Sequence, residues 1–293
     1  MSAPLALALV LAVAIPIQLW RAYRRDEAYV ERWAHYHGLG LTPENRPLVE
    51  RYLRHARVLR TWGGVAGAVV PSLIELAWHG RVEVLGFGAD GESAPLAFGT
   101  IFAGYLLGAL WAEVSLARPV AGARRSASLI RRELAAYLPP NLVRAQRGLA
   151  AAAGLGALAV GVVPYDDSVS TPGALSLALG ALLAVGFGAG LEAIERWLVR
   201  RPQPYTSPSL VAADDAIRAQ SIHAVAGAGL ALLLLFCGGV ALALQGSDVA
   251  WLQVAMVVPA AACLVASLVA CREIGDRAWR VRRQAHGKRA ASA

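Results

Sequence analysis

The sequence predicts an all-α fold, a polytopic membrane bundle of about seven transmembrane helices, and three observations support this prediction. Of the 293 residues, 57% are hydrophobic and only 16% are charged, and the mean hydropathy is +0.49. A soluble domain carries roughly a quarter charged residues. Long apolar runs recur along the whole chain, and basic residues gather in the segments between alternate runs. This composition therefore argues against a soluble enzyme.

Seven apolar runs have the length of a helical membrane crossing, which is roughly 17 to 25 residues. Helices are expected because an open strand edge leaves backbone groups unpaired in lipid, and the runs do not alternate as barrel strands would. The chain is expected to form one membrane domain over residues 1–293. Its spans are predicted at about 2–20, 61–79, 95–117, 148–164, 174–195, 224–244 and 250–271.

The distribution of basic residues predicts the orientation of these spans. Residues 21–60, 118–147, 196–218 and 272–293 hold nine, seven, four and seven of the 28 basic residues, and Arg81 alone lies on the opposite side. Basic loops are retained in the cytoplasm. We therefore expect a multi-pass protein of the plasma membrane with its N-terminus outside and its C-terminus inside. The basic pI near 9.9 reflects this bias and indicates no affinity for nucleic acid.

The first apolar run resembles a signal peptide, but its charges lie on the wrong side for that interpretation. A signal peptide carries basic residues before its apolar core, whereas Arg21 and Arg24 follow it here. This order favours an uncleaved first helix; cleavage would leave six spans with both ends in the cytoplasm.

The segment 21–60 is predicted to form cytoplasmic helices, and residues 272–293 a basic cytoplasmic tail. Leu48, Tyr52, Ala56 and Leu59 line one side of a helix whose arginines lie elsewhere. Amphipathic basic helices of this kind lie on anionic lipid or dock a partner.

Two glycine-rich stretches predict an internal repeat of about 82 residues. Residues 104–113 and 186–195 both read glycine, aromatic, two residues, glycine, four residues, glutamate, and Glu113 and Glu195 are 82 residues apart. The alternative is a chance match, because short stretches rich in glycine and alanine often resemble one another. Glycines spaced by four let two helices approach closely. Because Glu113 lies about 140 to 180° around its helix from the glycines, we expect it to point away from the neighbour that they contact.

One candidate polar site lies in the second predicted span. Glu75 and His79 are four residues apart and share a helix face, and Pro71 frees a backbone carbonyl one turn earlier. A charge at membrane depth costs roughly 2.5 to 3.5 kcal/mol on insertion scales, so it is retained for a reason. The pair is either a protonatable or cation-binding site or an interfacial histidine held by the glutamate.

A second candidate site is a ring of ion pairs at the cytoplasmic helix ends. Three acids lie in the last turns of descending helices, where the negative end of the helix dipole disfavours them. Arginines at the starts of ascending helices are the available partners. The ring would hold the bundle in register or gate a cytoplasmic vestibule; its predicted members are Glu113, Glu192, Glu195, Arg144, Arg147 and Arg218.

No catalytic residue, metal ligand set or cofactor site is predicted, so an enzyme is disfavoured. The only lysine, Lys288, lies in the polar tail, which excludes a retinal Schiff base, a pyridoxal site and a Walker-type loop. His35 and His37 lack a third ligand nearby. The three cysteines fall in or at the ends of spans, where cysteine behaves as a small apolar residue.

Residues 210–223, which read Leu-Val-Ala-Ala-Asp-Asp-Ala-Ile-Arg-Ala-Gln-Ser-Ile-His and continue into an apolar run, carry a resemblance. This stretch resembles an uncharacterised multi-pass integral membrane protein family of high-GC actinobacteria. The match covers about one loop and one span. It implies a membrane location and brings no activity or site residues.

Two functions fit these patterns. The sequence favours a transport-related component, either a small carrier or an accessory subunit of an exporter, with an ABC-type ATPase, a permease or further copies of the chain as partner. The alternative is a scaffold or sensor that holds a cytoplasmic partner through its arginine-rich helices. A water-accessible Glu75 would favour the carrier, and a dry bundle core the scaffold.

Overall fold

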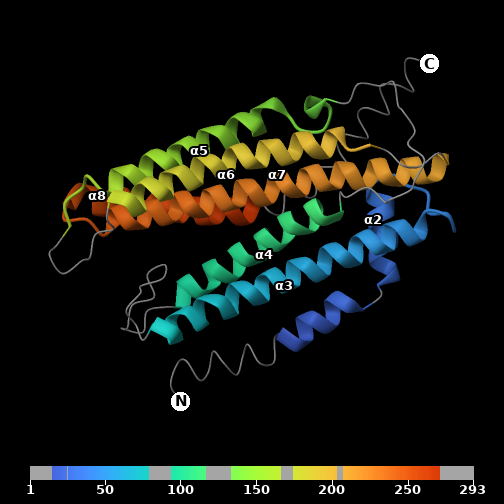
Figure 1. Cartoon of the computed structure of the whole chain (residues 1–293), viewed down its shortest axis with the longest axis horizontal. Helices are drawn as coiled ribbons and strands as arrows, with labels where there is room; N and C mark the ends of the chain where they lie inside the picture. Colours follow the sequence, from blue (N-terminus) through green and yellow to red (C-terminus); the bar gives the residue numbers. More distant parts are fainter. Residues whose placement is uncertain are drawn as a thin grey trace. The chain divides into compact units, whose positions relative to one another are not determined.

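The computed structural model describes residues 15–24, 26–78, 94–116, 133–165, 174–202 and 207–270, without the side chains of 72, 74–78 and 94–98. Its labelled helices are shown in Figure 1. They are α2 (Glu27–Tyr36), α3 (Arg46–Trp78), α4 (Ala94–Leu116), α5 (Pro140–Val160), α6 (Ala174–Arg200), α7 (Pro208–Gln245) and α8 (Ala250–Ala255).

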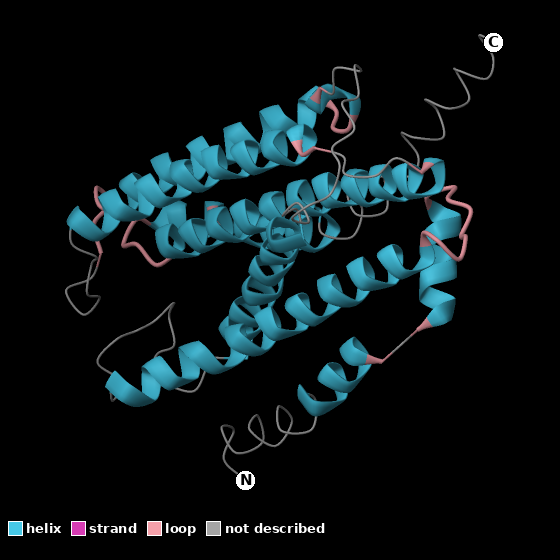
Figure 2. Cartoon of the chain, turned by 45° about the vertical axis from the view of Figure 1, so that its right-hand side comes forward, coloured by secondary structure: helices cyan, strands magenta, loops and turns pink. Residues whose placement is uncertain are grey.

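The described residues confirm the all-α prediction. Besides the labelled helices, residues 15–23 and 257–270 are helical, and a 3-10 turn at Leu134–Ala136 precedes α5. Figure 2 shows helices joined by loops, with no strand in the described ranges.

Four of the described helices are long and apolar enough to cross a membrane: Gly99–Leu116, Ala174–Arg200, Pro208–Gln245 and Ala250–Ala270. They correspond to the predicted spans at 95–117, 174–195, 224–244 and 250–271. Large apolar side chains such as Leu182 and Leu183 of α6 are largely exposed, as expected of helices that face lipid. These features are consistent with an integral membrane protein.

The other three predicted spans stay predictions. Residues 61–78 and 148–160 are helical within α3 and α5, and these helices are not among the four. Most of the first predicted span, 2–20, lies outside the described residues, as does the tail 272–293.

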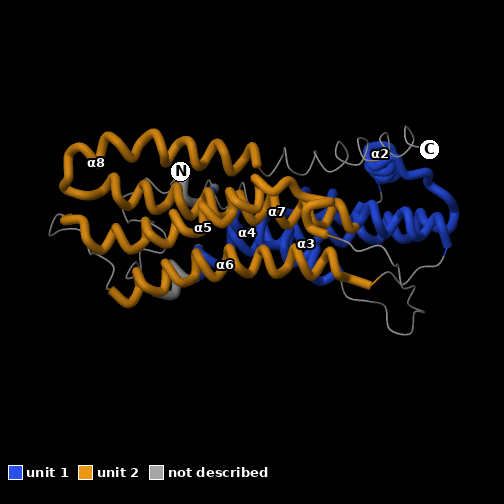
Figure 3. Tube along the Cα trace, turned by 90° about the horizontal axis from the view of Figure 1, so that it is seen from above, with its two compact units in different colours: residues 1–123, 205–217 blue, residues 124–204, 218–293 orange. Residues whose placement is uncertain are grey.

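The chain divides into two compact units, which Figure 3 distinguishes by colour. Unit 1 comprises residues 1–123 and 205–217, and unit 2 comprises residues 124–204 and 218–293. Each unit contains a hairpin of two antiparallel helices, α3 with α4 in unit 1 and α5 with α6 in unit 2.

The α3–α4 hairpin is packed backbone against backbone. A Cβ atom added at Gly63 would lie 2.3 Å from the carbonyl oxygen of Gly104, and one added at Gly108 would lie 2.4 Å from that of Leu59. At Gly67 the distance to the carbonyl oxygen of Thr100 would be 2.2 Å. The predicted close approach at Gly104 and Gly108 is therefore confirmed, and two glycines of α3 complete it.

The corresponding prediction for α6 is wrong. Nothing lies within 4 Å of a Cβ atom added at Gly186 or Gly190, whereas one added at Gly188 would lie 2.5 Å from the Cβ of Ala150. The buried residues of α6 include Ala184, Leu191 and Glu195, and together with Gly188 they recur every three or four residues. Gly186 and Gly190 fall between these positions and so lie on another side of the helix.

A small hydrophobic core joins three helical segments of unit 1. We call them the three-helix module: α2, residues 46–60 of α3 and residues 208–217 of α7. Trp33 and Tyr52 pack here with apolar residues of all three segments, and their ring centroids are 6.1 Å apart. The buried cluster comprises Val30, Trp33, Ala34, Val49, Tyr52, Leu53, Ala213, Ala216 and Ile217.

This core changes the interpretation of the amphipathic segment 21–60. Tyr52 and Ala56, on its predicted apolar side, are buried, and Leu48 packs against the cluster. That side is occupied by protein and is therefore not free to lie on lipid. The arginines Arg51 and Arg54 are exposed on the other side of α3.

Local hydrogen bonds set the ends of the module's helices. The Asp26 carboxylate accepts a hydrogen bond of 2.9 Å from the backbone N–H of Tyr29 and so caps α2. Before α3, the Asn45 Oδ1 accepts from the Thr42 N–H at 2.9 Å, and the Thr42 hydroxyl accepts from the Asn45 N–H at 3.2 Å. The Glu44 carboxylate accepts a hydrogen bond of 2.8 Å from the Ser207 hydroxyl, which ties the start of α7 to this loop.

Helix α7 is longer than the predicted span, because the stretch 210–223 is helical instead of a loop. Ala213, Ile217 and Ile222 are all buried, and because nine residues turn a helix by 180°, this part of α7 is buried on more than one side. In unit 2, α7 continues against the hairpin: a Cβ atom added at Gly229 would lie 2.5 Å from a methyl carbon of Leu191, and one added at Gly156 would lie 2.6 Å from a methyl carbon of Val240.

Candidate functional site

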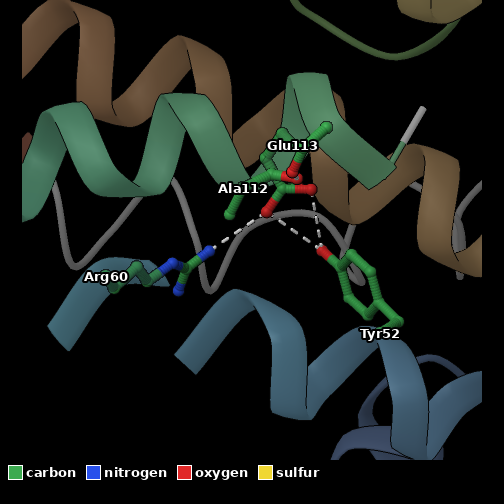
Figure 4. A network of polar contacts seen from close by, with 5 residues as sticks. Tyr52, Arg60, Ala112 and Glu113 are labelled. Carbon is green, nitrogen blue, oxygen red and sulfur yellow. Dashed lines mark hydrogen bonds and ion pairs between the residues drawn. The ribbon is translucent and has the colours of Figure 1, made fainter. Parts of the chain in front are cut away.

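In unit 1, the acid predicted near the end of α4 is buried against α3. Glu113 is 1% exposed. The Tyr52 hydroxyl donates toward both of its carboxylate oxygens at 3.3 Å, and Arg60 Nη2 donates to Oε1 at 3.2 Å. Figure 4 shows both donors reaching Glu113 from α3. The carboxylate is thus paired within its own hairpin.

This contact corrects two expectations. Arg60, which was not a predicted partner, pairs with Glu113. In addition, Glu113 and the two glycines of α4 engage the same neighbour, α3, although they lie on different faces of α4. Arg60 and Tyr52 have long side chains, so they reach from α3 to Glu113 although the glycines of α4 lie closest to the backbone of α3. A second polar contact joins the same helices, since the His55 Nε2 and Ser115 Oγ atoms lie 3.0 Å apart.

The environment of Arg60 favours its charged form. Burial acts to lower the pKa of this guanidinium, but the nearby Glu113 carboxylate more than offsets that effect, so the pKa lies above its ordinary value. Arg60 and Glu113 therefore form a buried ion pair, with the arginine side chain 24% exposed and the glutamate side chain fully buried.

In unit 2, the buried acid is Glu195, and its partner is an amide instead of an arginine. Gln146 Nε2 donates to Glu195 Oε1 at 2.9 Å and to the carbonyl oxygen of Ala226 at 3.4 Å. Gln146 thereby links α5, α6 and α7. The other carboxylate oxygen, Oε2, is buried and has no hydrogen-bond partner among the described residues. The predicted Glu195–arginine pair is therefore wrong.

Glu192, one turn earlier in α6, makes an exposed pair. Arg147 Nε donates to Glu192 Oε2 at 3.0 Å, and the Nη2 atoms of Arg147 and Arg196 both donate to Oε1. The hydrogen bond and charge of Glu192 raise the pKa of Arg147 above its ordinary value. This pair joins two members of the predicted ring.

Because both arginines of this cluster are more than half exposed, the pair is expected to add little to stability. We predict that Arg147→Gln leaves the thermal unfolding midpoint in mild detergent almost unchanged, since Arg196 keeps its contact with Glu192. A large drop in the midpoint would show that the contact stabilises the α5–α6 hairpin more than its exposure suggests.

The other two predicted arginines, Arg144 and Arg218, differ in their surroundings. Arg144 is exposed and makes no hydrogen bond or ion pair within the described residues. Arg218 is buried, and its Nη1 donates to the carbonyl oxygen of Val199 at 3.3 Å. Val199 lies in the last turn of α6, where a cation offsets the negative end of the helix dipole. Arg218 thus donates a hydrogen bond to a backbone carbonyl at the C-terminal end of α6.

The Glu75 and His79 pair cannot be placed. His79 lies outside the described residues, and Glu75 belongs to α3, but its side chain is not described. The pair stays a prediction. Among the described residues, no group of three or more His, Cys, Asp or Glu side chains is arranged to hold a metal ion.

Sequence reasoning missed the residues that hydrogen-bond to the two buried acids, Tyr52, Arg60 and Gln146. The sequence did contain a signal for Arg60. It directly precedes the second predicted span, just as Arg144 and Arg147, which were chosen as partners, precede the fourth. Gln146 carries no charge, so a search for ion pairs passed over it.

No family model, no curated protein and no solved structure matches this chain. The resemblance of residues 210–223 to actinobacterial membrane proteins therefore stays a prediction, and the functional argument rests on the geometry.

Both hairpins use one arrangement of polar groups. An acid near the end of the second helix, Glu113 or Glu195, accepts a hydrogen bond from a long polar side chain of the first helix, Arg60 or Gln146. Each contact gives a hydrogen-bond donor to an acid that the helix dipole disfavours and links adjacent helices. Their chemistry is that of structural joints.

Proposed function

We propose that this integral membrane protein is a non-transporting accessory subunit or scaffold, which carries a folded helical module for a partner protein. The observation that carries the proposal is the three-helix module. Its core holds α2, the first half of α3 and the start of α7 together through Trp33 and Tyr52. A module with its own core presents a fixed surface, whereas separate amphipathic helices would bury their apolar sides in lipid.

The closed polar contacts of the hairpins support a scaffold over a carrier. Glu113 is paired with Arg60 inside unit 1, and Glu192 is paired with Arg147 inside unit 2. Charges engaged in this way are not available to bind a cargo.

The proposal includes the topology inferred from the sequence. Seven spans with the N-terminus outside would place the module in the cytoplasm, on the side that holds 27 of the 28 basic residues. The location would be the plasma membrane.

The exposed side of the module defines the chemistry of the partner. Arg32, Arg51 and Arg54 are exposed there, and they favour an acidic protein surface. An ABC-type ATPase or permease with such a surface fits this role, and so does an acidic surface on a further copy of the chain.

Affinity purification of the C-terminally tagged protein from native membranes in mild detergent tests the proposal. We expect a partner at stoichiometric amount, and we expect the double variant Arg32→Gln/Arg54→Gln to lose most of it. The matched control is Arg144→Gln/Arg200→Gln, which removes two exposed arginines outside the module. Recovery of the chain alone, or equal loss in both variants, would contradict a module that binds a partner.

A small carrier is the second candidate, and one observation favours it. Glu195 has a buried carboxylate oxygen without a hydrogen-bond partner among the described residues, and it lies within a helix long enough to cross a membrane. Ionisable residues in such positions serve as proton relays in transporters. The carrier requires Glu195 to exchange protons with water, whereas the scaffold does not.

A further inference from the structure

Unit 1 contains a cavity of about 780 Å³ beside the three-helix module. Its walls come from the helix at residues 15–23, the start of α2, α3 and α4. This volume lies within the range of small-molecule sites, roughly 300 to 1,000 Å³. Four arginines line it: Arg21, Arg24, Arg57 and Arg60.

The acids that line the same cavity do not neutralise these arginines. The Asp26 carboxylate caps α2, and Glu27 lies 3.8 Å from Arg46. Arg60 is paired with Glu113. Arg21, Arg24 and Arg57 therefore have no carboxylate partner among the described residues, and the cavity keeps an excess of positive charge.

Arg57 is the most enclosed of the three unpaired arginines. Its Nε atom is buried and has no hydrogen-bond acceptor among the described residues. Its Nη2 donates weakly, at 3.4 Å, to the carbonyl oxygen of Arg24, and its guanidinium lies 5.0 Å from the centre of the Tyr29 ring. A buried guanidinium donor without an acceptor is costly, so this site is suited to an external anion.

The chemistry of several converging guanidinium groups is that of a phosphate site. Arginine donates two parallel hydrogen bonds to phosphate oxygens, and it tolerates partial burial better than lysine does. Carboxylates and phosphates both accept such paired hydrogen bonds, and the oxygens of a phosphate can engage more than one arginine at a time.

The aromatic residues of the cavity indicate where the phosphate comes from. Trp20 is 60% exposed at the end of the first predicted span, and Tyr105 belongs to a candidate membrane span. Between α3 and the helix at residues 15–23, Trp62 Nε1 donates to the Tyr23 hydroxyl at 3.2 Å. Tryptophan and tyrosine gather at the level of the lipid headgroups.

We propose that this cavity binds the phosphate of an anionic phospholipid headgroup, with Arg24 and Arg57 as its principal donors. A soluble phosphate ester shares the same chemistry, and the experiment distinguishes the two sources. The site does not depend on whether the module binds a protein partner.

Trp20 provides a direct readout. The full chain is reconstituted in phosphatidylcholine vesicles that contain the same small fraction of dibrominated phosphatidylglycerol or dibrominated phosphatidylcholine. We expect stronger quenching of tryptophan fluorescence by the brominated phosphatidylglycerol. Most of this excess should be lost in Trp20→Phe, because no other tryptophan whose side chain the structure describes lines the cavity.

Arginine variants test the donors. Arg57→Gln is expected to weaken the preference for phosphatidylglycerol about tenfold, as expected for the loss of one charge-assisted hydrogen bond. Arg54→Gln is the matched control: it lies one turn earlier on α3, is exposed and does not line the cavity. Arg57→Lys keeps the charge and should retain part of the preference, so it reports on binding if Arg57→Gln proves poorly folded.

Equal quenching by the two brominated lipids would overturn the lipid site, as would equal effects of Arg54→Gln and Arg57→Gln. Inorganic phosphate, titrated calorimetrically into the chain in phosphatidylcholine nanodiscs, provides the second arm. Binding of inorganic phosphate that Arg57→Gln abolishes, with no preference for phosphatidylglycerol, would support the phosphate chemistry and overturn the lipid source.

Discussion

Glu113→Ala is expected to destabilise unit 1 by roughly 3 to 5 kcal/mol, the range observed when one partner of a buried ion pair is removed. The substitution leaves Arg60 and the Tyr52 hydroxyl facing a cavity where their acceptor was. The effect is measured by unfolding the purified protein with sodium dodecyl sulfate in mixed micelles, followed by circular dichroism.

Two further variants separate charge pairing from packing. Arg60→Met combined with Glu113→Leu removes both charges and keeps the volume, so it should recover most of the lost stability. Glu50→Ala removes an exposed acid from the same module and should change stability little. If Glu113→Ala behaves like Glu50→Ala, the Arg60–Glu113 contact is not a structural joint.

Gly104→Ala is expected to force the α3–α4 hairpin apart and to cost roughly 1 to 3 kcal/mol, the usual cost of overpacking. The new Cβ atom would lie 2.3 Å from the carbonyl oxygen of Gly63 and 2.8 Å from the Cα of Gly67. Both neighbours are backbone atoms, so no side chain can rotate away.

Gly99→Ala is the matched control for this prediction. It lies on the same helix, and nothing lies within 4 Å of the added Cβ atom. Because alanine favours a helix over glycine by about 1 kcal/mol, Gly99→Ala should be neutral or slightly stabilising. The same unfolding assay applies to both variants. Equal effects of the two substitutions would contradict the close packing of α3 on α4.

Hydropathy and charge predicted much of this fold. The four candidate spans of the described chain correspond to four predicted spans, because length and apolar composition are local properties. The burial of Tyr52 and Ala56 followed from helical periodicity in the same way. The spacing of Gly104 and Gly108 also correctly predicted a close helix–helix contact.

The errors arose where the answer depends on a neighbour. Gly186 and Gly190 share the spacing of the α4 glycines, yet the face that α6 buries is set by Leu191 and Glu195 instead. The partners of Glu113 and Glu195 come from α3 and α5, and sequence alone does not show which residue of an adjacent helix lies at the same depth. The helical start of α7 was missed because Asp214, Asp215 and Arg218 interrupt its apolar residues, so hydropathy did not extend the predicted span to it.

The proton permeability of reconstituted vesicles tests the central claim, that the buried acids are structural joints in a non-transporting protein. The full chain and Glu195→Gln are incorporated into liposomes that contain a pH-sensitive dye, and a potassium gradient with valinomycin sets the potential. The account predicts that both proteins give the proton flux of protein-free liposomes. A flux above that level that Glu195→Gln abolishes would contradict it and identify Glu195 as part of a proton path.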